Sequence, residues 1–503
     1  MRHVPAASES VSPARHGAKT RVVPVDLSVS GIFGVLMREE GPRYPKLDVI
    51  IPKLSRAAVL LSFLAGACSR HEPTSSPVPP ETSAGATAEP APPASATAAP
   101  ATGNAAPATG NAASTASKAA AAPEEVGSDA GDDLGAAALT LYRVAACGTS
   151  GEIPAPLDAR LVARHCATLQ KIYERYRAGW VAVAKPFIER LRPKDLPKKV
   201  VYPFGGGDLV TALSVYPDAE EITTLSLESA GDVRYIDTIL PVRLVGALAV
   251  NARNIRKLLS ISYSNTINLG KGTRAWLPGE IVLMLTAMVV HGYEPTSLRY
   301  FRIMPDGSLH YLSTDEVNAE GTRTPVAPEG AGARFADVEI RFRKIGSSGP
   351  EKVVRHIAQD LSNEEVGKTP GLRAHLEAKG PVAVMTKAAS HLLWAEEFSI
   401  VRDYLLDHAV WMISDSTGIP PRFARAAGFV QDTYGVFAGP ARYGPIEALD
   451  GRDFRRLFAE NPPRALPFQF GYPDVHRRSH LVVMRKPSPV ASLAHPAAAP
   501  SGP

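Results

Sequence analysis

The stretch KVVYPFGGGDLVTALSVYPDAEEITTLSLE, residues 199–228, decides the fold class. It opens with an apolar run, breaks at three consecutive glycines and resumes with apolar residues at helical spacing up to Val215. After the turn Tyr216-Pro217-Asp218 a second apolar run begins, and it ends on Glu228. Strand, glycine turn, helix and strand in this order predict a βαβ unit with two parallel strands.

The segments downstream continue the alternation of helical and strand patterns. The predicted helices cover residues 157–190, 242–259, 280–291, 371–378, 386–395 and 398–406. The predicted strands cover residues 298–304, 309–312, 337–343, 352–359, 409–413, 429–437 and 480–485, and the first four form two hairpins. We therefore expect an α/β fold, a Rossmann-like open sheet with β-hairpin insertions, preceded by a disordered tether.

Low-complexity segments flank the predicted folded part. Residues 68–133 are almost entirely Ala, Pro, Thr, Ser and Gly, and such a composition cannot bury enough apolar surface to offset the entropy lost on ordering. We predict a disordered Ala/Pro-rich tether over 68–133, an α/β domain over 134–486 and a disordered tail over 487–503. As a flexible coil, a tether of about 65 residues would span roughly 40 to 50 Å.

The residues before Cys68 predict export from the cytoplasm. Lys53 and Arg56 precede a short apolar run, and small residues, Ala65-Gly66-Ala67, stand directly before Cys68. Positive charge, a short apolar stretch and small residues form the three parts of a secretory signal. The run of about eleven apolar residues is too short for a bilayer, which needs about 20. A removable signal peptide fits better than a membrane-spanning anchor.

The surroundings of Cys68 resemble the lipobox of bacterial lipoproteins. The preferred Leu of that motif is Leu64 here, one position before the usual place, which Ala65 occupies. The resemblance implies cleavage before Cys68, a diacylglycerol on its thiol and a further acyl chain, such as palmitate, on the new amino terminus. Two or three such chains, at about 0.8 kcal/mol per buried methylene, make a durable anchor.

These features predict where the protein works. Residues 1–67 are expected to be a leader and signal peptide, and a start at Met37 would leave residues 1–36 untranslated. We expect a lipid-anchored protein of the bacterial cell envelope whose partner is a membrane. Ser69 after the lipid site favours the outer membrane.

The net charge of +5 belongs largely to the leader. Residues 1–67 contain nine Lys or Arg and five Asp or Glu, so this segment carries +4 of the total. The basic clusters at 452–456 and 477–478 are interpreted as ordinary solvated surface. We therefore predict no nucleic-acid partner.

Cys147 and Cys166 are the remaining cysteines. In an oxidising envelope they are reasonable disulfide partners, with two buried free thiols as the alternative. His476 and His480 have the i, i+4 spacing of metal ligands, but Gly471-Tyr472-Pro473 precedes them and a strand follows, so no helix is expected there. We predict no metal site.

Two candidate ligand sites lie at predicted strand ends. Gly205, Gly206, Gly207 and Asp208 would let backbone amides approach a ligand at a helix N-terminus, and Glu228 ends the next strand where Rossmann-like nucleotide binders keep a ribose-binding acid. Asp415, followed by Ser416-Thr417-Gly418, could line the same crevice. The simpler interpretations are a glycine turn that packs a helix tightly on a sheet and a Pro-terminated turn.

The core around residues 199–228 resembles that of class I methyltransferases. Proteins of that class carry an antiparallel hairpin at one edge of the sheet, and residues 466–486 would form it here. The full G-x-G-x-x-G spacing is absent, because Leu209 and Val210 follow Asp208. S-adenosylmethionine and nicotinamide dinucleotides are not generally supplied outside the cytoplasmic membrane. We therefore predict no cofactor.

Five short motifs together resemble a family of uncharacterised bacterial envelope proteins. They are Tyr202-Pro-Phe-Gly-Gly-Gly-Asp208, Lys387-Ala-Ala-Ser-His-Leu392, Phe398-Ser-Ile-Val-Arg402, Asp415-Ser-Thr-Gly-Ile-Pro420 and Phe470-Gly-Tyr-Pro473. The resemblance covers roughly residues 200–485 and implies one undivided domain, not a reaction. Two functions stay open: a binding or envelope-associated module for a small-molecule or envelope ligand, and an enzyme with a degenerate methyltransferase-like crevice.

Overall fold

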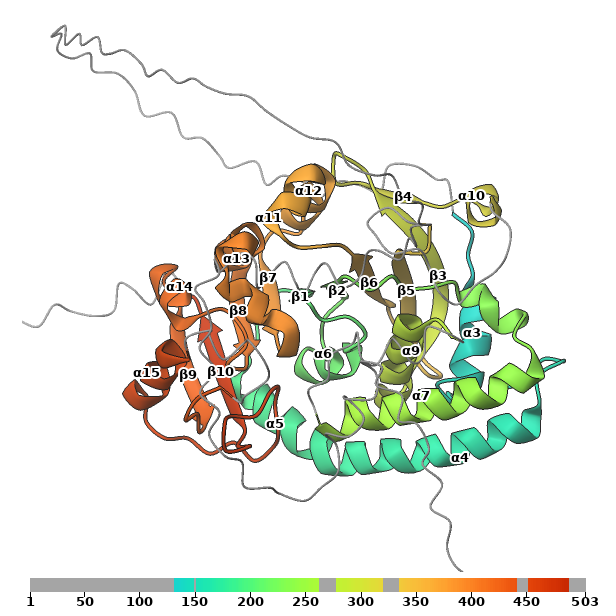
Figure 1. Ribbon diagram of the computed structural model, residues 1–503, viewed down its shortest axis with the longest axis horizontal. Helices are drawn as coiled ribbons and strands as arrows, with labels where there is room; N and C mark the ends of the chain where they lie inside the picture. The colour runs from blue at the N-terminus through green and yellow to red at the C-terminus, as the bar shows by residue number, and fades with distance from the viewer. Residues whose placement is uncertain (1–130, 149–150, 262–276, 320–333, 441–450, 488–503) are drawn as a thin grey trace, which may run out of the picture. The chain divides into compact units, whose positions relative to one another are not determined.

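The computed structural model describes residues 131–148, 151–261, 277–319, 334–440 and 451–487 (Figure 1). Cys68, the predicted signal peptide, almost all of the predicted tether and the predicted tail beyond residue 487 lie outside these ranges. No helix within them is long and apolar enough to cross a membrane.

Ten strands of the described residues form one mixed sheet. Their order from edge to edge is β4-β3-β5-β6-β2-β1-β7-β8-β10-β9. The strands are β1 Lys199–Pro203, β2 Glu221–Ser226, β3 Tyr293–Ile303, β4 Leu309–Tyr311, β5 Asp337–Lys344, β6 Lys352–Ala358, β7 Val382–Thr386, β8 Ala409–Ser414, β9 Val430–Gly435 and β10 His480–Arg485. Helices and a largely parallel sheet centre confirm the predicted α/β class.

The centre of the sheet is parallel and its edges are antiparallel. Strands β6, β2, β1, β7 and β8 all run in one direction. Along the chain these are the third, second, first, fourth and fifth strands of the set, so the order reverses between β1 and β7. On one side β5, β3 and β4 add antiparallel strands, and on the other β10 pairs antiparallel with both β8 and β9.

Both faces of the central strands are covered by helices. In β1 the side chains of Val200 and Tyr202 enter one core, and Val201 enters the other, because successive residues of a strand point to opposite faces. The first core is covered by α3 Gly135–Val144, α4 Ala159–Tyr176, α5 Ala182–Leu191, α6 Leu209–Val215, α7 Pro241–Ile261 and α9 Gly279–His291. The second is covered by α11 Asn363–Lys368, α12 Pro370–Glu377, α13 Ser399–His408, α14 Pro421–Ala426 and α15 Arg452–Glu460.

Short helical segments complete the described chain. They are the π-helical turn η2 Arg177–Val181, the 3-10 segments η3 Val233–Asp237, η4 Ala388–Trp394 and η5 Glu396–Phe398, and the helix α10 Thr314–Asn318. The helix predicted over residues 157–190 is therefore two α-helices joined by η2. The helix predicted over 386–395 is present as the shorter 3-10 helix η4, because Thr386 still belongs to β7.

The hairpin of β3 and β4 occurs as predicted, although β3 begins at Tyr293 instead of residue 298. The predicted hairpin of 337–343 and 352–359 pairs as β5 with β6. It is not an insertion, because β6 also pairs in parallel with β2 and belongs to the centre of the sheet.

Residues before 134 already pack against the sheet. The amide of Asp132 donates to the carbonyl of Leu312 at 2.9 Å, directly after β4. The carboxylate of Asp133 accepts from Ser297 Oγ and from the amide of Leu298, both at 3.1 Å, on β3. These two residues were assigned to the tether, and the structure instead attaches them to the edge of the sheet where β4 lies.

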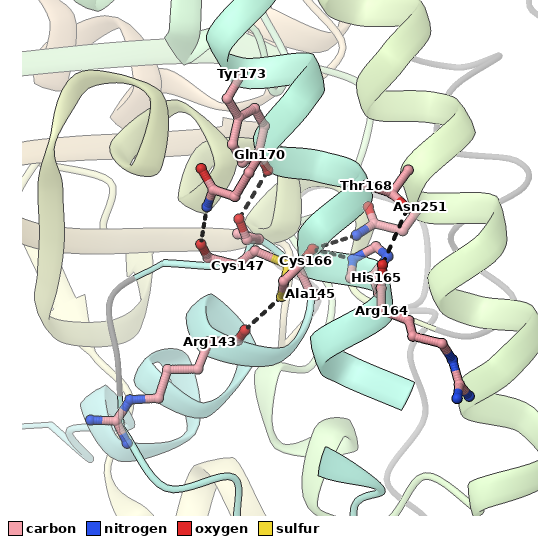
Figure 2. Close-up of a disulfide and its surroundings, with 11 residues drawn as sticks. Arg143, Ala145, Cys147, Arg164, His165, Cys166, Thr168, Gln170, Tyr173 and Asn251 are labelled. Carbon is pink, nitrogen blue, oxygen red and sulfur yellow. Dashed lines mark hydrogen bonds between the residues drawn. A yellow bond between two sulfur atoms is a disulfide. The ribbon is translucent and has the colours of Figure 1, made fainter. Parts of the chain in front are cut away.

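A disulfide joins Cys147, after α3, to Cys166 of α4 with an S–S distance of 2.08 Å. Figure 2 shows that side chains from α4 and α7 also hold the backbone beside it. The carbonyls of residues 145, 146 and 147 accept hydrogen bonds from His165 and Asn251, from Tyr173, and from Gln170 respectively. Of the two alternatives, paired or free thiols, the structure has the paired one.

Candidate functional site

Five parallel strands of the sheet end at the same edge, and the residues after them form the candidate site. The carboxyl ends of β1 and β7 flank the point where the strand order reverses, which is where open α/β sheets bind ligands. The residues that directly follow β1, β6 and β7 are Phe204, Gln359 and Lys387, and those that follow β2 and β8 are Leu227 and Asp415.

The glycine turn after β1 is packed against the chain's own helix. A Cβ atom on Gly207 would lie 2.7 Å from Leu283 Cβ and 3.0 Å from Glu280 Oε2, both on α9. The amide of Gly205 donates to the carbonyl of Leu225 on β2 at 3.1 Å. Glycine permits a close approach of the backbone to other groups. At Gly207 this approach serves packing against α9, and at Gly205 it serves a hydrogen bond to β2.

Asp208 forms a buried ion pair with Lys387 at the reversal of strand order. Lys387 Nζ lies 2.7 Å from Asp208 Oδ2, and the side chains of the two residues are only 3% and 8% exposed. Lys387 Nζ also donates to Thr211 Oγ1 at 2.8 Å, and the Thr211 hydroxyl donates to Asp208 Oδ1 at 2.8 Å. The pair joins the end of β7 to the end of β1 and to the first turn of α6.

Tyr202 of β1 links this pair to the candidate residue after β8. Its hydroxyl donates to Asp208 Oδ2 at 3.0 Å. Burial, followed by the negative charges of Asp208 and Asp415, raises the pKa of Tyr202 well above its ordinary value. The phenol therefore stays protonated and acts as a donor between two of the acids that the sequence singled out.

Asp415 is fully buried and holds two loops together. Its Oδ1 accepts hydrogen bonds from the amide of Thr417 at 2.8 Å and from the Thr417 hydroxyl, and its Oδ2 accepts from the amide of Tyr472 at 2.8 Å. A Cβ atom on Gly471 would lie 1.9 Å from Asp415 Oδ2, and Gly471 has a φ of +62°, so glycine is required there.

His480, the first residue of β10, completes the β8 end of the site. Its Nε2 accepts from the amide of Ser416 at 3.0 Å and lies 2.7 Å from Ser416 Oγ. Burial lowers the pKa of His480 to about 4, although Asp474 opposes the shift. The imidazole is therefore neutral at neutral pH, and it fixes the turn after Asp415.

Glu228 is buried, but its backbone is held by a different strand. The carbonyl of Glu228 accepts a hydrogen bond from His356 Nε2 of β6 at 2.6 Å, and its amide donates to Ser226 Oγ at 3.3 Å. The charges of Asp208 and Asp415 thus both act on Tyr202, whereas the backbone of Glu228 is anchored to β6.

The five sequence motifs converge at this edge. Lys387 Nζ lies 5.8 Å from the ring centroid of Phe470, and the amide of Tyr472 reaches Asp415. The rings of Phe204 and Phe398 are 6.0 Å apart. Residues separated by more than 250 positions in the sequence therefore form one connected cluster.

The sequence did not identify Lys387 and His480 as site residues. Lys387 directly follows a buried strand, and a charged residue in that position is the signal that could have pointed to it. His480 begins a buried strand, and it was weighed only as a metal ligand.

The histidine pair does not form a metal site. His476 is exposed, His480 is fully buried, and the residues between them are not helical. Asp474 accepts from the amides of His476 and Arg478 and from the guanidinium of Arg478. Within the described ranges, no group of three or more His, Cys, Asp or Glu side chains is arranged to hold a metal ion.

Comparison of the chain with protein-family models, curated proteins and solved structures finds no match.

Proposed function

We propose that this protein is a lipoprotein of the bacterial cell envelope, anchored through Cys68, whose Rossmann-like α/β domain acts as a binding or envelope-associated module. The anchor is supported by the order of Lys53, the apolar run and Ala65-Gly66-Ala67 before Cys68. The non-catalytic role is supported by one observation in the folded domain, the buried pair of Asp208 and Lys387.

The pair of Asp208 and Lys387 lies where a nucleotide-dependent enzyme of this architecture would need side chains that are available to bind the nucleotide. Asp208 already accepts from Lys387, Tyr202 and Thr211, so its carboxylate is committed to the protein. The approach to Gly207 is filled by Leu283 and Glu280 of α9. A ligand that entered here would have to displace these contacts, and breaking a buried ion pair is costly.

One observation favours the alternative, an enzyme with a methyltransferase-like crevice. The five parallel strands have the order of a doubly wound sheet, and antiparallel β10 lies between β8 and β9. This is the kind of antiparallel edge that class I methyltransferases carry. The strand order supports a fold shared with the methyltransferases. Activity, in contrast, depends on the residues of the site.

A ligand screen separates the two functions. The purified chain with Cys68→Ser is tested by thermal shift and calorimetry against S-adenosylmethionine, other nucleotides, sugars and peptidoglycan fragments. We expect no response to S-adenosylmethionine and stabilisation by an envelope ligand. Saturable binding of S-adenosylmethionine that Glu228→Gln weakens would favour the methyltransferase-like alternative and overturn the proposal.

The anchor is tested by fractionation. The parent chain should stay in the membrane fraction, and Cys68→Ser should release it. Ser69→Ala is a matched control, because it changes the next residue without removing the thiol. Membrane retention of Cys68→Ser without a change in mass would overturn the lipid anchor.

A further inference from the structure

Exposed arginines gather where the chain forms the β9 edge of the sheet. Figure 1 shows α14 and α15 beside β9 and β10. Seven arginines on α14, on α15 and in the turn before β10 are exposed. We call six of them, all except Arg452, the basic face. They are Arg422, Arg425, Arg455, Arg456, Arg477 and Arg478.

Contacts join these three segments into one surface. Arg425 and Arg456, on α14 and α15, share Glu460 at 3.2 and 2.6 Å. Arg422 lies 3.5 Å from Asp453 of α15. Arg455 Nη1 is 3.1 Å from the position of a Cβ on Gly439.

The turn before β10 attaches to the same place. The carbonyl of Gly439 accepts from the amide of Val475 at 2.9 Å, so Arg477 and Arg478 follow directly from a residue held beside α15. Arg478 pairs with Asp474, whose carboxylate is fully buried. Val430, Val436 and Val475, each a little over 40% exposed, add apolar surface to the same region.

Among the residues of this region that the structure describes, the arginines outnumber the acids. Glu460 is shared by two arginines, and the side chain of Asp453 is only 17% exposed. Residues 131–487 contain 44 Lys or Arg and 39 Asp or Glu, a net charge of +5, because residues 68–130 are acidic. The six arginines of the basic face, together with Asp453, Glu460 and Asp474, contribute +3 of that charge at the β9 edge of the sheet.

The path of the chain shows what this surface can reach. The described chain begins at Gly131 beside β4, and β4 and β9 are the two edges of the sheet. At about 4.8 Å per strand, these edges lie roughly 40 Å apart along the sheet. A flexible coil with the number of residues between Cys68 and Gly131 would span about the same distance.

We propose that the basic face docks on anionic phospholipid headgroups of the bilayer that anchors Cys68. This proposal rests on the lipid anchor of the proposed function. Arginines attract an anionic lipid surface, and the half-exposed valines suit the headgroup region. The tether keeps the domain at a high effective concentration near the membrane, so weak docking suffices.

Vesicle co-sedimentation tests the docking without the anchor. The full chain with Cys68→Ser should bind vesicles of phosphatidylcholine mixed with phosphatidylglycerol, should bind pure phosphatidylcholine far less, and should dissociate at high salt. Replacing Arg422, Arg455 and Arg456 with Gln should weaken binding on the order of one hundredfold, at roughly fivefold per arginine.

The matched control removes the same charge from another helix. Arg164→Gln, Lys171→Gln and Arg175→Gln change three exposed residues of α4, which covers the first core, and should leave vesicle binding within about twofold of the parent. Equal loss in both triple variants, or equal binding to neutral and anionic vesicles, would overturn the proposal. Tighter binding to duplex DNA than to anionic vesicles would overturn it in favour of a nucleic-acid partner.

The two proposals fail separately. If Cys68→Ser does not release the chain from cell membranes but the vesicle assay succeeds, the anchor is wrong and the docking surface stands. If Cys68→Ser releases the chain and the vesicle assay shows no preference for anionic lipid, the anchor stands and the docking surface is wrong.

Discussion

Lys387 Nζ lies 2.7 Å from Asp208 Oδ2, and the two residues follow β7 and β1, the strands between which the order of the sheet reverses. In an open α/β sheet this place is a crevice for ligands. Here a buried ion pair with Tyr202 and Thr211 around it ties the two halves of the sheet together. The same residues that suggest a nucleotide site in the sequence thus contribute to the integrity of the domain.

Removing the ammonium group should leave a buried carboxylate without its charge partner. We expect Lys387→Met to lower the free energy of unfolding by about 3 to 5 kcal/mol, measured by urea denaturation. The double variant Lys387→Met with Asp208→Asn should recover much of that loss, because no uncompensated charge remains. A double variant no more stable than the single one would show that the pair does not act as a unit.

Asp337, at the start of β5, makes stability depend on pH between about pH 4 and 7. Burial raises the pKa of Asp337 to about 7, although the amide of Ala358, which donates to Oδ1 at 2.8 Å, opposes the shift. Because the folded-state pKa is above the unfolded one, the folded protein binds the proton more tightly. This contribution to stability is complete below about pH 4 and is lost as the pH rises to about 7.

Asp337→Asn should remove that dependence and keep the acceptor for Ala358. Between pH 4 and 7 the parent should lose stability at up to about 1.4 kcal/mol per pH unit relative to the variant. Urea denaturation of both proteins across this range measures the difference. Parallel curves would contradict the raised pKa.

The sequence predicted the parts of the fold that depend on local pattern. Residues 199–228 form the βαβ unit as expected, because a turn of glycines separates two short apolar runs. Strand β7 was missed, because it is buried on both faces and its apolar run cannot be distinguished from part of a helix by periodicity. Helix α15 was missed as well, since Phe454 and Leu457 are its only fully buried apolar residues.

The sequence predicted two acids of the candidate site, but it did not predict the ion pair between Asp208 and Lys387. Asp208 and Asp415 were recognised because each follows an apolar strand. The partner of Asp208 could not be found in this way, because Lys387 is far from it in the sequence and only the parallel pairing of β1 with β7 brings them together. The location of an ion pair of this kind is a property of the tertiary fold.

The disulfide should stabilise the first helical layer without being needed for folding. A loop closed by cysteines 19 residues apart contributes about 3 kcal/mol, so Cys147→Ala with Cys166→Ala should lower the free energy of unfolding by that amount. The fold should persist, because hydrogen bonds from Tyr173 and Gln170 still hold the backbone there. A reductant should destabilise the parent equally and leave the double variant unchanged. Equal sensitivity of both proteins would contradict this assignment.

Gly207 distinguishes a packing role of the glycine turn from a ligand role. A Cβ there would lie 2.7 Å from Leu283 Cβ, so Gly207→Ala should force α9 to move and cost about 1 to 3 kcal/mol of stability by urea denaturation. Gly246→Ala is the matched control, because no atom lies within 4 Å of its added Cβ and Ala favours the α7 helix by about 0.5 to 1 kcal/mol. An unchanged stability of Gly207→Ala would mean that α9 yields easily, and the turn would then be accessible to a ligand.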